Sequence, residues 1–530
     1  MDIGSADEDV KTYIHALKSA SDARIHALEQ QVALLLEELS LARHKRFGRS
    51  SEHEPIGPSL PFFSDELREQ NPSASVIETV TVAEHERKKS GRKKLDPELP
   101  RVETVIDISD ADKICACGAH LVRIGAETCE KLHHIPEKYF VEVIVRPYYA
   151  CKKCEGFEDQ GKSPVRVAPV PPAIIPKGFA TADLLASIAV NKFCDHLPFY
   201  RQEQRLSRLG VSISRTDMAN WMIKAGTTVL PLLDMLHERQ KQGDVINMDE
   251  TPVTVMGEEG KANSAKSYMW LMRGGPPGAP CITYHYRVSR GAAEARSLME
   301  GFSGYLQTDG YDSYPAAIAG TPIVHVGCWA HARRRFFDAA KASPESGIGV
   351  DGVAWIKKLY AIERVLRRSR DEGKISAQEF KRRRIEEATP ILSALHAWLL
   401  AESEKVLPSS LAGKAVSYTL GQWQALSRYI EHADLTPDNN SAENAIRPFV
   451  LGRKNWMICG SPDGAAVACL FYSLIETAKA NGFNPFDYLM TLFYFAPRAT
   501  NEQDWIRLLP LKGMYNPPGP VSIPVPPGLF

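Results

Sequence analysis

Between residues 243 and 343, short apolar runs alternate with turns and helical stretches, and their order restricts the possible folds more than any other feature. Runs typical of strands occupy residues 245–255, 267–272, 282–286, 305–309 and 322–326. Helices are expected from about Gly291 to Met299 and from Ala330 to Ala340. With a further short helix between the fourth and fifth strands, the segment reads as three strands, a helix, a strand, a helix, a strand and a helix, which predicts an α/β domain.

This order is typical of an RNase H-like core, in which the first and fourth strands are neighbours. Asp249 lies in the first strand and Asp309 at the end of the fourth, so both carboxylates should meet at one edge of the sheet. Glu443 follows in a segment where Ser441 can cap a helix. A glutamate on that helix can complete the site formed by the two aspartates. Three convergent carboxylates need cations to stay ionised, which predicts a catalytic Mg²⁺ or Mn²⁺ site held by these acids.

The remaining sequence changes composition from segment to segment, which predicts a multidomain protein. We expect a coiled-coil, leucine-zipper-like helix at 1–52, a basic Pro-containing linker at 53–100, a zinc-binding knuckle at 101–160, a helical, helix-turn-helix-like region at 170–240, the first part of the core at 243–343, a large helical insertion at 344–437, the completion of the core with the catalytic Glu and C-terminal helices at 438–500, and a Pro-rich tail at 501–530. A chain of 530 residues is long enough for about three to four domains.

Apolar residues in the first segment follow the alternating spacing of three and four that marks a coiled-coil seam. The seam consists of Ile25, Leu28, Val32, Leu35, Leu39 and Ala42, within a helix expected over residues 11–43. The pattern favours a homo-oligomer, and the alternative is an ordinary amphipathic helix on a domain surface.

Two cysteine pairs occupy the segment 101–160. The first pair is Cys115-x-Cys117 and the second is Cys151-x-x-Cys154. A strand-like stretch at 139–145 separates them, and two pairs on turns suit a tetrahedral Zn²⁺ site. The first pair is one residue shorter than the usual spacing; possible substitute ligands are His120, Cys129, His133 and His134. The alternative is a reduced, metal-free cluster.

The region 170–240 carries a possible DNA-reading motif. A Gly turn, a Ser/Thr cap and an apolar helix over residues 210–221 resemble the second half of a helix-turn-helix. A plain helical hairpin explains the same pattern equally well.

Basic and acidic residues balance over the whole chain, with 64 Lys and Arg against 64 Asp and Glu. The basic residues are clustered, however, and phosphate contact depends on charge within about a Debye length, roughly 8 Å. The residues expected to contact DNA are Lys45, Arg46, Arg49, Lys88, Lys89, Arg92, Lys93, Lys94, His331, Arg333, Arg334, Arg447, Arg453 and Lys454. The balance of charge therefore argues only against sequence-blind coating of DNA.

Apolar runs in this sequence are short compared with the roughly 18 residues that a membrane helix requires. The acidic start of the chain also lacks the basic and apolar pattern of a signal peptide. We therefore expect a cytoplasmic protein without membrane contact.

Several motifs occur together in a specific order along the chain. They are KRFGRSSE at 45–52, LHHIP at 132–136, YACKKC at 149–154, LPFYRQE at 197–203, MDET at 248–251, TDGYDSY at 308–314, CWAHARRRF at 328–336, DNNSAE at 438–443 and GRKNW at 452–456. In this order they resemble the transposases of the insertion-sequence-sixty-six family of bacterial mobile elements, over nearly the whole chain. The Cys115-x-Cys117 pair departs from the family, which usually has C-x-x-C there.

The resemblance implies a DDE transposase whose acidic triad maps onto Asp249, Asp309 and Glu443. It implies two-metal-ion DNA cleavage at element ends followed by strand transfer, action at the bacterial nucleoid, and small accessory proteins encoded by the same element. Two alternatives are a catalytically inactive zinc and coiled-coil DNA-binding relic, and an RNase H-like nuclease or resolvase.

Overall fold

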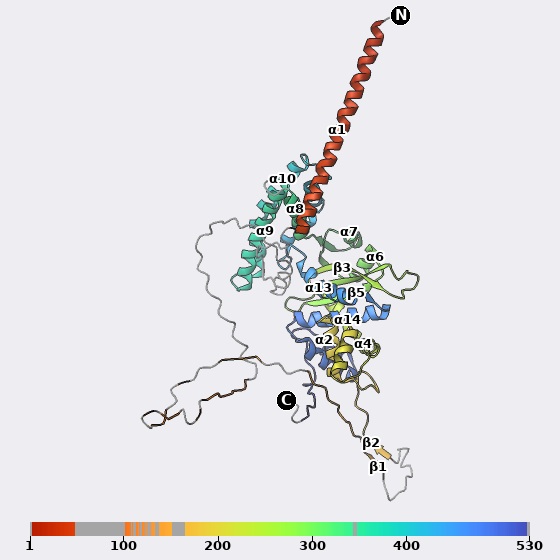
Figure 1. The fold of residues 1–530 in the computed structure, drawn as a ribbon, viewed down its shortest axis with the longest axis vertical. Helices are drawn as coiled ribbons and strands as arrows, with labels where there is room; N and C mark the ends of the chain where they lie inside the picture. Colours follow the sequence, from red (N-terminus) through yellow and green to blue (C-terminus); the bar gives the residue numbers. More distant parts are fainter. Residues whose placement is uncertain are drawn as a thin grey trace. The chain divides into compact units, whose positions relative to one another are not determined.

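The computed structural model describes residues 3–47, 165–342 and 347–526, together with residues 101–150 except for 108, 110–112, 115, 117–118, 122–124, 126–128 and 133–136. The chain divides into two units, Pro55–Val141 and the remainder, which we describe separately. The larger unit is a mixed α/β structure in which helices predominate around one mixed sheet (Figure 1).

The sheet has the strand order β5-β4-β3-β6-β7, with β8 also paired to β3. Its strands are β3 (Val245–Val255), β4 (Lys266–Gly274), β5 (Cys281–Arg287), β6 (Gly304–Gln307), β7 (Ile323–Val326) and β8 (Ile458–Cys459). The pairs β3–β4 and β4–β5 are antiparallel, whereas β3–β6 and β6–β7 are parallel. The first and fourth strands of the core are therefore neighbours, as the order of apolar runs predicts.

Helices cover the sheet on both faces and close its β5 edge. They include α6 (Ala292–Leu298), α7 (Ser313–Ile318), α8 (Trp329–Ala342), α13 (Asn440–Trp456) and α14 (Pro462–Ala480), and α15 (Pro485–Phe495) packs against α14. The backbone N–H groups of Ile282 and Tyr284 in β5 donate to the side-chain hydroxyls of Thr477 and Ser473 in α14, at 3.0 and 2.8 Å. These hydroxyls satisfy donors that an open edge strand would expose.

The helices before the sheet are α2 (Ala182–Phe193), α3 (Phe199–Arg208), α4 (Arg215–Val229) and α5 (Pro231–Gln240). The turn between α3 and α4 passes through Gly210 at φ 79°, a conformation that favours glycine. Ser214 then caps α4 by accepting from the Asp217 N–H at 3.0 Å. Trp221 and Met222 of α4 are buried in the core shared with α14, so this helix is partly committed to packing.

The helices of the insertion and α8 together form a second hydrophobic core. It contains α9 (Ile348–Asp371), α10 (Ala377–Ser403), α11 (Leu411–Gly421), α12 (Trp423–Ser427) and the 3-10 helix η1 (Arg428–Glu431). Arg384 of α10 is fully buried and pairs with the Glu363 carboxylate of α9 at 2.8 Å. Figure 1 shows α9 and α10 lying beside each other, away from the sheet.

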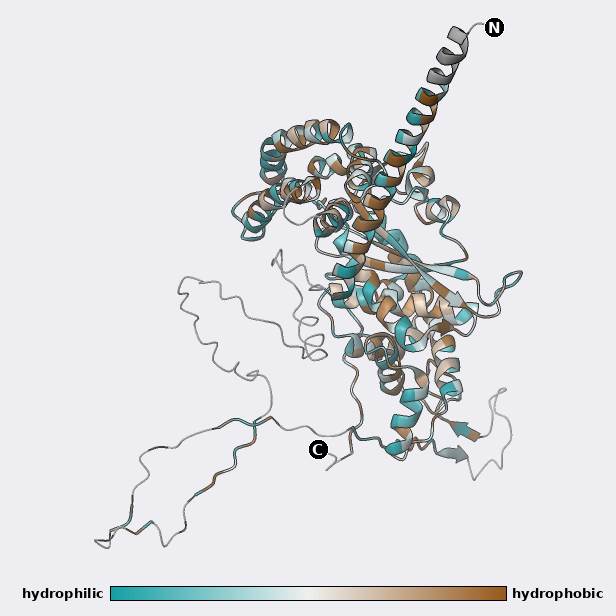
Figure 2. Ribbon diagram, turned by 45° about the horizontal axis from the view of Figure 1, so that its top comes forward, coloured by the Kyte–Doolittle hydropathy of each residue, from teal (hydrophilic) through white to brown (hydrophobic). Residues whose placement is uncertain are grey.

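The first segment forms one long helix, α1 (Ile3–Phe47), which extends beyond the expected 11–43. Apolar residues recur along it (Figure 2), and the seam residues from Ile25 to Leu39 are 47–57% exposed. Its last turns contact the insertion, where the Leu411 N–H donates to Glu37 at 3.1 Å. No helix in the described parts of the chain is long and apolar enough to cross a membrane.

The strand expected at 139–145 is not formed in the described residues. The first strand, β1 (Tyr148–Ala150), begins later and pairs antiparallel with β2 (Val165–Val167). Val141 and Ile144, which lie on opposite sides of an alternating pattern, are 87% and 63% exposed, so neither side has a core to cover. Cys115, Cys117, Cys151 and Cys154 lie outside the described residues.

The end of the chain also differs from the expected tail. Residues 501–511 are not a separate extension, because they include α16 (Glu502–Ile506) and the buried Leu508, Leu509 and Leu511. These leucines belong to the core that contains α14 and α15. Extended chain without helix or strand follows over residues 516–526.

Candidate active site

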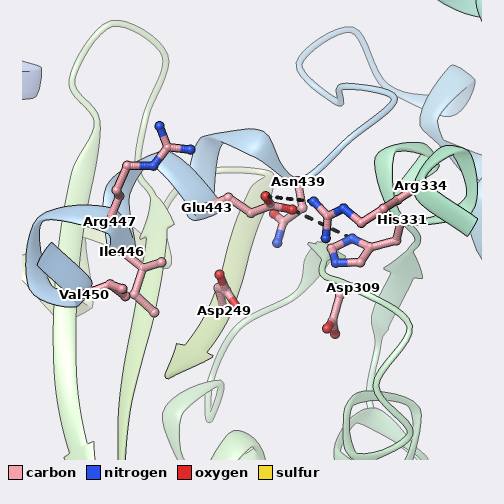
Figure 3. A pocket seen from close by; sticks show the side chains of 9 residues that line it. All are labelled: Asp249, Asp309, His331, Arg334, Asn439, Glu443, Ile446, Arg447 and Val450. Atoms are coloured by element: carbon pink, nitrogen blue, oxygen red, sulfur yellow. Dashed lines mark ion pairs between the residues drawn. The ribbon is translucent and has the colours of Figure 1, made fainter. Parts of the chain in front are cut away.

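The three predicted acids lie on separate elements that meet at one cavity of about 310 Å³. Asn247 of β3 is paired with Gln307 of β6, and because these strands are parallel, Asp249 and Asp309 both follow at the same end of the sheet. Glu443 reaches the cavity from the first turn of α13. The remaining lining residues, shown in Figure 3, are His331, Arg334, Asn439, Ile446, Arg447 and Val450.

Asp249 sits in a poorly solvated, negatively charged environment. The pKa of its carboxyl is raised from 3.8 to about 8, chiefly by burial and then by repulsion from Glu250, Asp309 and Glu443. The Glu250 N–H donates to Asp249 Oδ1 at 2.8 Å and opposes this rise. The described residues therefore compensate the negative charge at this position only in part, which favours a cation there.

Glu250 has a different environment from its neighbour. The hydroxyl of Tyr314 donates to Glu250 Oε2 at 2.5 Å, and Glu250 does not line the cavity. Burial raises the pKa of Glu250 as well. These contacts give Glu250 a structural role, because successive side chains of a strand point to opposite faces of the sheet.

Asp309 is held by a tight turn after β6. The Tyr311 N–H donates to Asp309 Oδ1 at 3.0 Å. Gly310 lies against α11, so that a Cβ at this position would come within 2.5 Å of the Tyr418 hydroxyl. The glycine in this motif therefore permits the close approach of the insertion to Asp309.

Glu443 faces two basic side chains of α8 (Figure 3). Its Oε1 is 3.8 Å from His331 Nδ1, and its Oε2 is 3.9 Å from Arg334 Nη2. Burial lowers the pKa of His331, although Glu443 and Asp309 oppose this effect. The carboxylate is thus turned toward α8 in this structure.

One group of potential metal ligands among the described residues differs from the acidic triad. Cys328, His331 and Glu443 each offer a ligand atom, and these atoms lie within 4.8 Å of one another. Cys328 is a buried thiol, and burial raises its pKa to about 12.

A buried polar network beneath the cavity was missed by the sequence reasoning. Asn439 is 1% exposed and donates from Nδ2 to the Met248 carbonyl at 2.8 Å, while its Oδ1 accepts from Asn247 at 3.0 Å. Asn247 also donates to Gln307 at 3.1 Å. The network joins β3, β6 and the start of α13, so it sets the positions of the segments that carry all three acids. The one available signal was the position of Asn439 in the motif that contains Glu443.

The insertion also holds the segment that leads into Glu443. The Tyr360 hydroxyl of α9 donates to Asp438 Oδ2 at 2.9 Å. Arg367 and Arg370 of the same helix donate to the carbonyls of Leu435 and Ala433, at 2.6 and 2.8 Å. In α10, Arg384 donates to the carbonyls of Tyr429, His432 and Leu435. Helices α9 and α10 are therefore fastened to the last residues of the insertion and, through Tyr360, to Asp438 just before α13.

The residues expected to contact DNA have different environments in the structure. His331, Arg334 and Arg447 line the cavity, and Lys454 is exposed at the end of α13. Arg333 lies 5.8 Å from the Phe337 ring. Residues Arg49, Lys88, Lys89, Arg92, Lys93 and Lys94 lie outside the described part, as does the side chain of Lys45, and Arg46 is exposed in the last turn of α1.

Arg453 has a structural role that was not expected. Its guanidinium donates to the Thr251 hydroxyl at 2.9 Å and to the Pro252 carbonyl. These bonds fasten α13 to β3, and burial lowers the pKa of Arg453. The guanidinium of Arg453 is thus engaged in hydrogen bonds to β3.

Comparison with known families gives consistent matches along the chain. Residues 177–467 match the model described as "Transposase IS66 family", residues 34–104 the model "Transposase C of IS166 homeodomain", residues 112–155 the model "zinc-finger binding domain of transposase IS66", and residues 473–511 the model "IS66 C-terminal element".

Curated relatives are found in Sinorhizobium fredii. The uncharacterized protein y4qI is 32% identical over 494 residues, which cover 89% of this chain and 88% of the relative. The uncharacterized protein y4jD is 30% identical over 410 residues, covering 74% of this chain and 76% of the relative. A third uncharacterized protein, y4hP, is 28% identical over 479 residues, covering 87% and 84%.

Proposed function

Because the chain belongs to the IS66 family of transposases, we propose that it is a DDE transposase that cleaves DNA at the ends of its element and transfers the freed strands into target DNA. The observation that carries the proposal is the convergence of Asp249, Asp309 and Glu443 on one cavity from three separate elements. The sheet order β5-β4-β3-β6-β7, antiparallel at one end and parallel at the other, supports an RNase H-like core.

We propose that these three acids hold Mg²⁺ or Mn²⁺. The donor set fits, because all three side chains offer carboxylate oxygens and Asp249 is buried among like charges that a cation would neutralise. When bound, such ions would activate the attacking water or 3′-hydroxyl and stabilise the leaving oxygen in phosphoryl transfer.

The basic side chains around the cavity suit the DNA backbone. His331 and Arg334 stand on one side of Glu443, and Arg447 projects from α13 on the other (Figure 3). Arginine and histidine donate to phosphate oxygens, and a phosphate that takes the donors of His331 and Arg334 would free the Glu443 carboxylate from them. We therefore assign these three residues to orienting the scissile strand, and we remove Arg453 from the proposed DNA contacts.

Other parts of the chain would bind DNA or partners outside the cavity. We propose a zinc-binding knuckle with Cys115, Cys117, Cys151 and Cys154, and the zinc-finger family match over residues 112–155 supports it. The basic arm at 87–94 and the helix pair α3–α4 would contact DNA, and the exposed seam of α1 would join copies of the chain. Because the substrate is DNA, we place the protein in the bacterial cytoplasm at the nucleoid, with small accessory proteins as possible partners.

The test is cleavage and strand transfer on DNA carrying the element's ends. Wild-type protein with Mg²⁺ should release a 3′-hydroxyl and join it to target DNA, whereas Glu443→Gln should be slower by about 10²-fold or more, as for other groups that stabilise transition-state charge. Asp312→Asn, at an exposed position near Asp309, serves as the matched control. Equal cleavage by Glu443→Gln would refute the triad. Binding without cleavage would indicate a DNA-binding relic, and cleavage without joined product would indicate a nuclease.

A further inference from the structure

Three side chains of mixed ligand type point at one another beside the acidic cavity. The Cys328 thiol, the His331 imidazole and the Glu443 carboxylate have ligand atoms that all lie within 4.8 Å of one another. Asp249 and Asp309 form no comparable group with Glu443 among the residues that the structure describes. The tightest candidate metal ligands near this cavity therefore include sulfur and nitrogen as well as oxygen.

The bonding of these atoms is incomplete. His331 Nδ1 and Glu443 Oε1 face each other at 3.8 Å, which is too long for a hydrogen bond. Both atoms are shielded from solvent and have no hydrogen-bond partner within the described chain. Buried polar atoms without partners are rare, and a cation between these two would satisfy both.

The backbone supports a metal site here. Cys328 immediately precedes α8 and His331 lies in its first turn, so a spacing of three residues brings both to one side of the helix start. The Asn439 N–H donates to Cys328 Sγ at 3.2 Å. Hydrogen bonds of this kind hold and tune a metal-binding thiolate from outside the ligand shell. Glu443 joins the group from α13, one turn beyond Asn439.

We propose that Cys328, His331 and Glu443 bind a zinc ion, and that zinc bound there inhibits the enzyme. Thiolate, imidazole and carboxylate are the ligand types that Zn²⁺ takes, and the two anionic groups balance its charge, whereas Mg²⁺ prefers oxygen alone. A Glu443 carboxylate engaged with Cys328 and His331 is unavailable to Asp249 and Asp309. The inhibition rests on the proposed function, but the binding does not.

Binding can be tested with Co²⁺ as a spectroscopic substitute on the full-length chain. A thiolate ligand gives Co²⁺ a charge-transfer absorption, and the difference between wild type and Cys328→Ser cancels any contribution from other cysteines. We expect a positive difference for Cys328→Ser and none for Cys194→Ser, a matched control at a partly buried cysteine in the C-cap of α2. A difference spectrum of zero for Cys328→Ser would overturn the proposed site.

Inhibition is measured as loss of DNA cleavage when Zn²⁺ is added at saturating Mg²⁺. Cys328→Ser should keep the activity in Mg²⁺ alone and need at least about 10-fold more Zn²⁺ for half inhibition, since even loss of an outer-shell partner costs about 10–100-fold in metal affinity. Equal zinc sensitivity in wild type and variant would overturn the inhibitory role. If Cys328→Ser unfolds, Cys328→Ala replaces it in both assays. If wild type shows no cleavage in Mg²⁺, the proposed function fails, while the Co²⁺ difference still decides the site.

Discussion

Replacing Asp249 by asparagine should stabilise the metal-free protein, because the wild-type carboxylate is buried next to other carboxylates. Its pKa of about 8, against an ordinary 3.8, means that folding favours the protonated form. A carboxyl with a raised pKa contributes stability that is complete below pH 3.8 and is lost as the pH rises to about 8. Asparagine has the same shape, accepts the Glu250 N–H and carries no charge, so it avoids this loss.

The size of the effect follows from the pKa. One pH unit corresponds to about 1.4 kcal/mol, so the full rise from 3.8 to about 8 sets an upper limit of about 6 kcal/mol. Water and cations that enter the open cavity screen the repulsion, and we expect about 2–4 kcal/mol at pH 8. At roughly 2 °C per kcal/mol, the melting temperature of Asp249→Asn should exceed that of wild type by about 4–8 °C.

The assay is thermal unfolding in EDTA between pH 5 and pH 9, with Asp312→Asn as the control for loss of an exposed carboxylate. The advantage of Asp249→Asn should grow from pH 5 to pH 8 and then stay constant. Adding Mg²⁺ should stabilise wild type more than the variant, because a ligand stabilises only the state that binds it. A difference that does not change with pH, or a variant less stable than wild type at pH 8, would refute a buried, repelled carboxyl at Asp249.

Two further predictions concern the insertion and the first helix. Tyr360→Phe removes the hydrogen bond to Asp438, worth about 1.5–3 kcal/mol for a charged acceptor, and should raise the Mg²⁺ concentration needed for half-maximal cleavage. An unchanged Mg²⁺ dependence would mean that this bond does not help to position Glu443. The control is Tyr494→Phe, at an exposed site. Combining Leu28→Ser with Leu35→Ser should lower the mass measured by light scattering to that of one chain, since each leucine buried on association is worth about 1.5–3 kcal/mol. An unchanged mass would place self-association elsewhere, and His26→Ser, at an exposed position off the seam, is the control.

Sequence reasoning succeeded where a local pattern has a single structural consequence. The apolar run before Asp249 and the run that ends at Asp309 are strands in the expected order, and the parallel pairing of β3 with β6 brings both acids to one end of the sheet. It failed at 139–145, where alternating residues have no surface to cover in the described chain. An alternating pattern shows that a strand is possible, whereas its formation depends on a partner that the local sequence does not contain.

The position of Glu443 depends on contacts that no local pattern contains. Asn439 binds Met248 and Asn247 of β3, while Tyr360 of α9 binds Asp438. Each of these pairs joins residues that lie far apart in the chain, and each buried polar group costs stability unless its partner is present. The insertion and the sheet therefore hold the start of α13 from two sides. Since an error of about 1 Å in a reacting group can cost about 10²-fold in rate, we infer that the insertion contributes to catalysis by fixing this helix, in addition to any contact with DNA.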